Sequence, residues 1–135
     1  MLSDPISDML IRIKNAQAVK RKGVEVPFSN IKFRIAEILS KKGFVGQVKR
    51  ISKKKGKKSH EFILIALRYE KDGSPAISDL KRISKPGRRI YLKAGEIKKV
   101  KGGRGVLIIS TPKGLMTGFQ AKRENVGGEA IAEIW

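Results

Sequence analysis

The sequence contains no cysteine and only one histidine, His60, among its 135 residues. Without cysteine the chain has no disulfide framework, no thiolate nucleophile and no cysteine-ligated zinc or iron–sulfur centre. A catalytic triad or a two-histidine metal site within one chain would have only this imidazole to build on. We therefore expect a protein that is not an enzyme and needs no cofactor, and we expect His60 to be a structural or surface residue.

Long apolar runs are also missing. Residues 1–14 lack the uninterrupted apolar segment of a signal peptide, and the longest apolar runs, such as residues 62–67, have only the length of a strand. A membrane-surface protein would need a basic amphipathic helix with bulky apolar anchors, and no segment fits that pattern. We expect a soluble, cytoplasmic protein that has no membrane partner and no small-molecule substrate.

Aromatic residues are scarce, at 6% of the chain, whereas basic residues are abundant. The 31 lysines and arginines against 12 acidic residues give a formal net charge of +19. Such a charge favours a polyanionic partner, and nucleic acid is the default. Because few rings are available to stack on unpaired bases, structured or duplex RNA is favoured over a bare strand.

Two segments are strongly basic. Residues 38–60 contain nine basic residues and no acidic one, and residues 81–104 contain ten basic residues against Glu96 alone. A solvated surface explains any single lysine, but contact with phosphates explains the whole set better. The alternative to a specific RNA binder is a non-specific basic RNA-binding or RNA-chaperone protein that reads only phosphates.

The chain begins with the pattern of an amphipathic helix. Pro5 suits the first helical position, where its missing N–H costs nothing, and Ser3 or Asp4 can cap the helix. Apolar residues then recur at helical spacing and form one stripe: Ile6, Met9, Leu10, Ile13 and Ala16. This stripe is suited to packing against a sheet.

A second helix is predicted after a short strand over residues 24–26, which Pro27 ends. Ser29 can cap this helix, and residues 41–43 are typical of its end. The apolar face of the helix is expected to contain Ile31, Ile35, Ile38 and Leu39.

Two strands, residues 44–51 and 61–69, are predicted to form an antiparallel hairpin. Its connection, residues 52–59, is expected to be a loop in which five of eight residues are lysine. The strongest turn signal follows at residues 71–75, and it divides the sequence into two subdomains, 1–72 and 73–135.

The second half is predicted to be rich in strands, with one or two short helices. The glycine-rich residues 102–105 lead into one of these strands. Residues 127–128, both glycine, are expected to break a short helix. The predicted elements are strand 76–83, turn 85–87, strand 88–93, strand 106–109, a helix from Thr117 to Glu124, and strand 129–135.

Three ordered motifs and a double glycine resemble the bacterial-type form of small-subunit ribosomal protein eight, and the resemblance runs from end to end. The three motifs are Asp4–Leu10 with Arg12–Ala16, Ile83–Tyr91, and Gly105–Gly114 with Met116–Thr117, and the double glycine is the start of Gly127–Glu129. The resemblance implies an α+β fold with an N-terminal α-β-α-β-β subdomain and a C-terminal β-rich subdomain.

The resemblance also implies a function. A member of this family is a structural constituent of the ribosome that binds a helix in the central domain of 16S ribosomal RNA directly. It acts early in assembling the platform of the 30S subunit and lies beside neighbouring small-subunit ribosomal proteins. Many members also repress translation by binding their own mRNA. The isolated chain is expected to be a monomer.

The family's Ser-Thr-Ser-Lys-Gly loop enters the RNA minor groove, and its counterpart here is residues 110–114. Ser110 and Thr111 can each exchange hydrogen bonds with a 2′-hydroxyl or base edge, Lys113 can meet a phosphate, and Gly114 lets the backbone turn near the RNA. Pro112 departs from the family and removes a hydroxyl and an N–H. The alternative is an ordinary turn that contains proline.

Further RNA contacts are implied for a basic turn and an acidic residue. Lys85, Arg88 and Arg89 are expected to present cations to phosphates, with Tyr91 near bases or riboses. The alternative is a solvent-facing turn with Tyr91 in the core. Glu129 is expected to accept hydrogen bonds in the recognition network, or else simply to begin an exposed strand.

Two residues of the first subdomain complete the predicted site. Asn15 and Lys32 are expected on polar helix faces, from which they could reach the RNA backbone. Plain solvation is the alternative for both of them.

Overall fold

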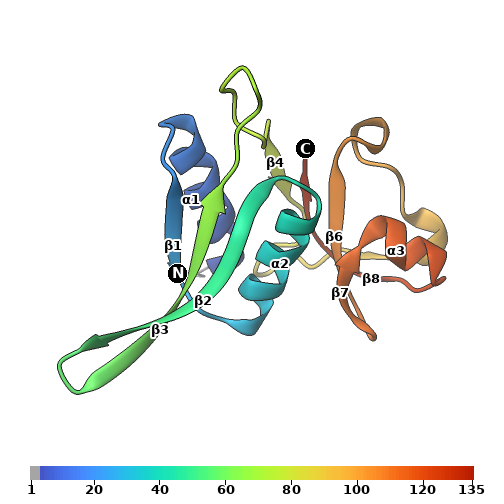
Figure 1. Cartoon of the computed structure of the whole chain (residues 1–135). Coiled ribbons are helices and arrows are strands. Elements are labelled where there is room, and N and C mark those ends of the chain that lie inside the picture. Colours follow the sequence, from blue (N-terminus) through green and yellow to red (C-terminus); the bar gives the residue numbers. More distant parts are fainter. Residues whose placement is uncertain (1–3) are drawn as a thin grey trace. The chain divides into compact units, whose positions relative to one another are not determined.

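The computed structural model describes residues 4–135, and it is mixed α+β (Figure 1). This confirms the predicted fold class, including the α-β-α-β-β order of the first half. In chain order the elements are α1 (Pro5–Ala18), β1 (Gly23–Pro27), α2 (Asn30–Lys41), β2 (Val45–Lys55), β3 (Lys58–Leu67), β4 (Leu80–Arg82), β5 (Tyr91–Leu92), η1 (Ala94–Glu96), η2 (Lys101–Gly103), β6 (Val106–Thr111), β7 (Gly114–Thr117), α3 (Gly118–Arg123) and β8 (Gly128–Ile134).

The chain divides into two compact units. One is Asp8–Ile77, and the other is Ser78–Trp135 together with the described residues before Asp8. The subdomain boundary that the sequence places after residue 72 stays a prediction.

The unit Asp8–Ile77 is built on an antiparallel sheet with the strand order β1-β3-β2. Along β3, Ile63 and Ile65 are fully buried, whereas Phe62 and Leu64, which alternate with them, are half-buried. Successive strand residues point to opposite faces, so one face of this sheet lies against the core. Helix residues with almost no exposed surface complete that core: Met9, Leu10, Ile13, Ile35, Ala36 and Leu39.

Local capping explains where the helices of this unit begin. The Asp4 carboxylate accepts a hydrogen bond from the N–H of Ser7 (3.2 Å), as expected for a cap of α1. The other predicted cap, Ser3, lies outside the described residues. The hydroxyl of Ser29 accepts from the N–H of Lys32 and caps α2 as predicted. The expectation for Ile31 is wrong, because 42% of its surface is exposed.

The segment 52–59 is not the loop that its composition predicts. Strands β2 and β3 stay paired from Ser52↔Glu61 to Lys55↔Lys58, and only Gly56 and Lys57 connect them. Gly56 has φ +64° and Lys57 does not have a positive φ, as in a type II′ hairpin turn. Because β1 ends opposite Phe62, this part of the hairpin is a ribbon of two strands that extends past the sheet (Figure 1).

The second unit contains an antiparallel sheet in the order β4-β8-β6-β7, with β5 also paired to β8. Strand β8 is central, since it pairs with β6 along one edge and with β4 and β5 along the other. The core cluster of this second unit consists of Ile97, Val100, Leu107, Ile109, Met116, Ala121 and Ala130.

Several strand predictions for this unit need correction. The predicted strand 76–83 is reduced to β4. Its first residue, Ala76, belongs to the unit Asp8–Ile77, where its N–H donates to the carbonyl of Arg68 in the same unit. The predicted strand 88–93 is reduced to β5, because residues before Tyr91 bond within a turn. Strand β7 was not predicted, since its four residues follow a turn signal directly.

The short helix of this unit was predicted correctly. The hydroxyl of Thr117 accepts from the N–H of Gln120 (3.2 Å) and caps α3, which Glu124 ends. Within residues 4–135 no helix combines the length and apolar character that a membrane crossing requires.

Candidate nucleic-acid interface

Three predicted site residues that are distant in sequence lie in one row across the second sheet. Ser110 of β6 is directly opposite Glu129 of β8, and Glu129 is directly opposite Tyr91 of β5. Residues opposite one another on neighbouring antiparallel strands share a face, so the three side chains project from the same side of the sheet. With strands about 4.8 Å apart, the row spans roughly 10 Å.

The members of this row offer different chemistry. Tyr91 has 69% of its surface exposed, which contradicts the alternative that placed it in the core. Within residues 4–135 the hydroxyl of Ser110 has no hydrogen-bond partner, so it is available to a ligand. The row therefore presents a ring, a carboxylate and a hydroxyl side by side.

Glu129 forms an ion pair with a residue of the predicted basic turn. Its Oε2 lies 3.3 Å from Nη1 of Arg89, with the side chain of Glu129 20% exposed and that of Arg89 49% exposed. The pair offsets the negative charge that Glu129 would otherwise bring to an RNA surface. It also holds the Arg89 guanidinium beside the row of Ser110, Glu129 and Tyr91.

The hairpin between β6 and β7 uses the hydroxyl of Thr111 internally. Its Oγ1 donates to the carbonyl of Gly114 (2.8 Å) and accepts from the N–H of Lys113 (3.1 Å). Only 9% of the Thr111 surface is exposed. The Thr111 hydroxyl thus stabilises the turn, whereas the sequence predicts that it contacts RNA in the same way as the Ser110 hydroxyl.

The tip of this hairpin consists of Pro112 and Lys113, and both are exposed. Proline suits the first central position of a tight turn, where its fixed φ is already favourable. Nζ of Lys113 lies 3.8 Å from Oε1 of Glu124 at the end of α3. Both partners are substantially exposed, so this pair leaves Lys113 accessible.

The predicted basic turn is present. Lys85 and Arg88 form reciprocal backbone hydrogen bonds of 2.9 Å, N–H to carbonyl in each direction. The buried Ser84 hydroxyl accepts from the N–H of Ile90 (2.9 Å) and closes the same loop. Lys85 and Arg88 are exposed and have no acidic partner among residues 4–135, so their charges are available to phosphates.

Gly127 and Gly128, which the sequence predicts only as a helix break, allow close backbone approach beside the site. A Cβ on Gly128 would collide with the carbonyl oxygen of Ser110, and one on Gly127 would collide with the carbonyl oxygen of Leu92. The two glycines therefore let three strands meet beside the site. The sequence feature that indicates this role is a double glycine directly before a strand, which is typical of close backbone approach.

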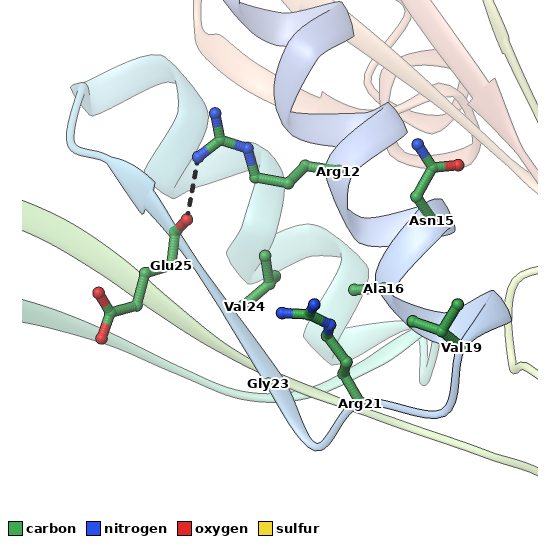
Figure 2. Close-up of a pocket in the computed structure, with 8 residues that line it drawn as sticks. All are labelled: Arg12, Asn15, Ala16, Val19, Arg21, Gly23, Val24 and Glu25. Carbon is green, nitrogen blue, oxygen red and sulfur yellow. Dashed lines mark hydrogen bonds between the residues drawn. The ribbon is translucent and has the colours of Figure 1, made fainter.

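The remaining predicted residues, Asn15 and Lys32, belong to the unit Asp8–Ile77. Asn15 is exposed on α1 as expected. It borders a depression of about 530 Å³ between α1 and β1, and Figure 2 shows Arg12 and Arg21 at this depression. Nη1 of Arg12 donates to the carbonyl of Glu25 at its edge (3.2 Å).

Lys32 does not lie on a polar face, and that expectation is wrong. Only 7% of its surface is exposed, because α2 turns it toward the core. Burial lowers the pKa of its ammonium group, the nearby Arg12 lowers it further, and Asp8 acts in the opposite direction. A contact between Lys32 and RNA stays a prediction.

The described residues contain no group of three histidine, cysteine, aspartate or glutamate side chains suited to hold a metal ion.

Comparison with known proteins identifies relatives over the whole chain. The sequence model of the family described as "Ribosomal protein S8" matches residues 4–135. The small ribosomal subunit protein uS8 of Mycoplasmopsis pulmonis is 50% identical over 135 residues, which cover all of this chain and 98% of the relative. The protein of the same name from Streptococcus pyogenes serotype M5 is 49% identical over 135 residues, which cover all of this chain and 99% of the relative.

Proposed function

The chain belongs to the ribosomal protein S8 family, and from this premise we propose that its second unit binds a helix in the central domain of 16S ribosomal RNA. Membership makes it a structural, non-enzymatic constituent of the small ribosomal subunit, which confirms the predicted class of protein. It associates there with ribosomal RNA and other ribosomal proteins.

The row of Ser110, Glu129 and Tyr91 carries the proposal. An A-form helix exposes 2′-hydroxyls and base edges in its wide, shallow minor groove. The free Ser110 hydroxyl can both donate to and accept from such groups, and the exposed Tyr91 ring can pack on a ribose or an unstacked base. A row of roughly 10 Å matches a contact across a few nucleotides.

The basic groups around the row supply affinity rather than specificity. Lys85 and Arg88 project from the turn, and Lys113 projects from the neighbouring hairpin. Contacts of such cations with phosphates orient a protein on a helix but carry no sequence information. These cations would therefore bind phosphates, and the row of Ser110, Glu129 and Tyr91 would recognise the helix.

The role in assembly follows from direct RNA binding. A protein that binds its RNA helix without help from other proteins can bind early and stabilise the platform of the 30S subunit. The same surface would also bind a similar helix in the protein's own mRNA and thereby repress its translation. We propose both roles as consequences of one interface.

The experiment is a titration against a central-domain fragment of 16S ribosomal RNA and against a scrambled duplex of equal length, with excess tRNA at moderate salt. We expect a large preference for the fragment, and the mRNA element can be tested in the same assay. Equal affinity for both RNAs would support the alternative of a non-specific basic RNA-binding or chaperone protein.

A variant tests whether the row provides that preference. Ser110→Ala should weaken binding to the fragment about fivefold, which corresponds to one hydrogen bond of about 1 kcal/mol, and should leave scrambled-duplex binding unchanged. Ser78→Ala is the matched control, because Ser78 is an exposed serine of the same unit. Equal losses on both RNAs would contradict groove recognition by Ser110.

A further inference from the structure

The ribbon beyond Phe62 concentrates positive charge in a narrow extension of the first unit's sheet. Within residues 52–59 the lysines are Lys53, Lys54, Lys55, Lys57 and Lys58. Only Lys53 has an acidic partner among the described residues, with its Nζ 2.7 Å from Oε2 of Glu25. The other four ammonium groups lie on exposed residues and have no compensating charge in the described chain.

The register places two of these lysines directly against each other. Lys55 and Lys58 form the last pair of the ribbon, on either side of the two-residue turn. Side chains of opposed residues share a face with Cβ atoms about 4.5–5.5 Å apart, and like charges in such positions are destabilising. Lys54 points to the other face of the ribbon because strand residues alternate.

This arrangement lowers the stability of the free ribbon but suits an anion. Two ammonium groups on one face can both donate to the oxygens of a single phosphate, which would replace their repulsion with two charge-assisted hydrogen bonds. A two-stranded ribbon also keeps the rest of the unit away from the nucleic acid, so only the tip needs to fit the backbone.

We propose that Lys55 and Lys58 form a phosphate-binding pair, through which the ribbon tip holds the backbone of an RNA duplex without reading its sequence. This contact belongs to the unit Asp8–Ile77. It is additional to the row of Ser110, Glu129 and Tyr91, which belongs to the second unit. The affinity of the pair does not depend on whether that row recognises a particular helix.

The first test measures RNA affinity against salt for Lys55→Gln/Lys58→Gln, on both the central-domain fragment and the scrambled duplex. Loss of two phosphate contacts should reduce the slope of log affinity against log salt by about 2 and weaken binding roughly tenfold at moderate salt. Both RNAs should be affected equally. The matched control is Lys22→Gln/Lys71→Gln, two exposed lysines of the same unit.

Thermal unfolding of the free protein separates this role from a structural one. Removing the repulsion between Lys55 and Lys58 should leave the midpoint unchanged or raise it slightly, while RNA affinity falls. A lower midpoint, or a control variant that loses as much RNA affinity, would overturn the proposal. An unchanged salt slope would overturn it as well.

Site-directed cleavage locates the contact. Because the chain has no cysteine, Lys57→Cys provides a unique position at the ribbon tip for a tethered iron–EDTA group. We expect cleavage of the bound RNA above that from Lys22→Cys, and equal cleavage would overturn the proposal. If the wild type does not prefer the fragment, the proposed function fails while these tests still report on the ribbon through the scrambled duplex.

Discussion

The backbone of Gly128 packs directly against Ser110, with the Cα of Thr111 only 3.0 Å from the position that a Cβ on Gly128 would occupy. A methyl group there would also collide with the Ser110 carbonyl oxygen. Strands β6 and β8 can therefore stay paired beside the site only while residue 128 is glycine. This contact connects the stability of the second unit with the geometry of its site.

Gly128→Ala should destabilise the second unit and weaken RNA binding together. Because the collision is with backbone, relief requires the strands to move apart, and we expect a loss of about 3 kcal/mol in the free energy of unfolding, the upper end of the usual cost of overpacking. Urea unfolding measures this loss. Gly95→Ala is the control, since no atom lies within 4 Å of its added Cβ, and a similar loss there would contradict the explanation.

Replacing Thr111 should distinguish a turn-forming hydroxyl from an RNA-binding one. Thr111→Val leaves the N–H of Lys113 and the carbonyl of Gly114 without their partner, so it should lower the free energy of unfolding by about 1 kcal/mol. Thr111→Ser retains the hydroxyl and should restore both stability and RNA affinity. If Thr111→Val unfolds like the wild type but loses RNA affinity, the hydroxyl acts on RNA directly.

Tyr91→Ala should weaken RNA binding without changing stability. The ring is 69% exposed, so the free protein gains little from it, whereas stacking on a base is worth about 1–3 kcal/mol. Filter binding to the central-domain fragment and thermal unfolding of the free protein are the two measurements. Phe119→Ala removes the other highly exposed ring of this unit, 68% exposed, and we expect it to bind RNA normally.

The buried Lys32 should make stability depend on pH in the alkaline range. Its pKa in the folded chain is lowered below the ordinary 10.5, so between the two values the unfolded chain binds more protons. The free energy of unfolding therefore rises as the pH increases through this interval. Lys32→Met should abolish that rise and, by removing a buried charge, add about 1 kcal/mol at neutral pH.

Urea unfolding between pH 7 and pH 11 tests this expectation. Lys22→Met is the control, because Lys22 is exposed in the same unit and should leave the pH dependence as it is in the wild type. Identical pH profiles for the Lys32 variant and the wild type would show that burial does not affect the titration of this lysine.

Features that depend on neighbours in sequence were predicted well. Examples are the helix caps at Ser29 and Thr117 and the turn at Lys85–Arg88. Each of them forms within a few residues, so the local sequence is enough to predict it. The ribbon was not predicted, because the lysine content of residues 52–59 indicates a loop and the sequence alone does not show the strand pairing. A run of lysines resembles a loop, but the partner strand and the type II′ turn at Gly56 keep it in the sheet.

The sequence predicted which residues belong to the candidate site, but it did not predict how they are arranged in space. Tyr91, Ser110 and Glu129 lie on three strands, and only their long-range pairing places them in one row. The burial of Lys32 likewise depends on packing around α2, which its own helix does not determine. The turn-forming role of the Thr111 hydroxyl was not predicted, because a sequence motif does not show which hydrogen bonds are satisfied within the turn. An RNA contact by Thr111 stays a prediction.

The loop between Ser84 and Ile90 is closed twice, once by the backbone pair of Lys85 and Arg88 and once by the Ser84 side chain. Its backbone has thus lost most of its conformational entropy on folding, before any RNA arrives. A loop ordered only upon binding would subtract that entropy from the affinity. We therefore expect association to be rapid and to order little further backbone, with Arg88 and Arg89 presented in nearly the same geometry in the free and bound protein.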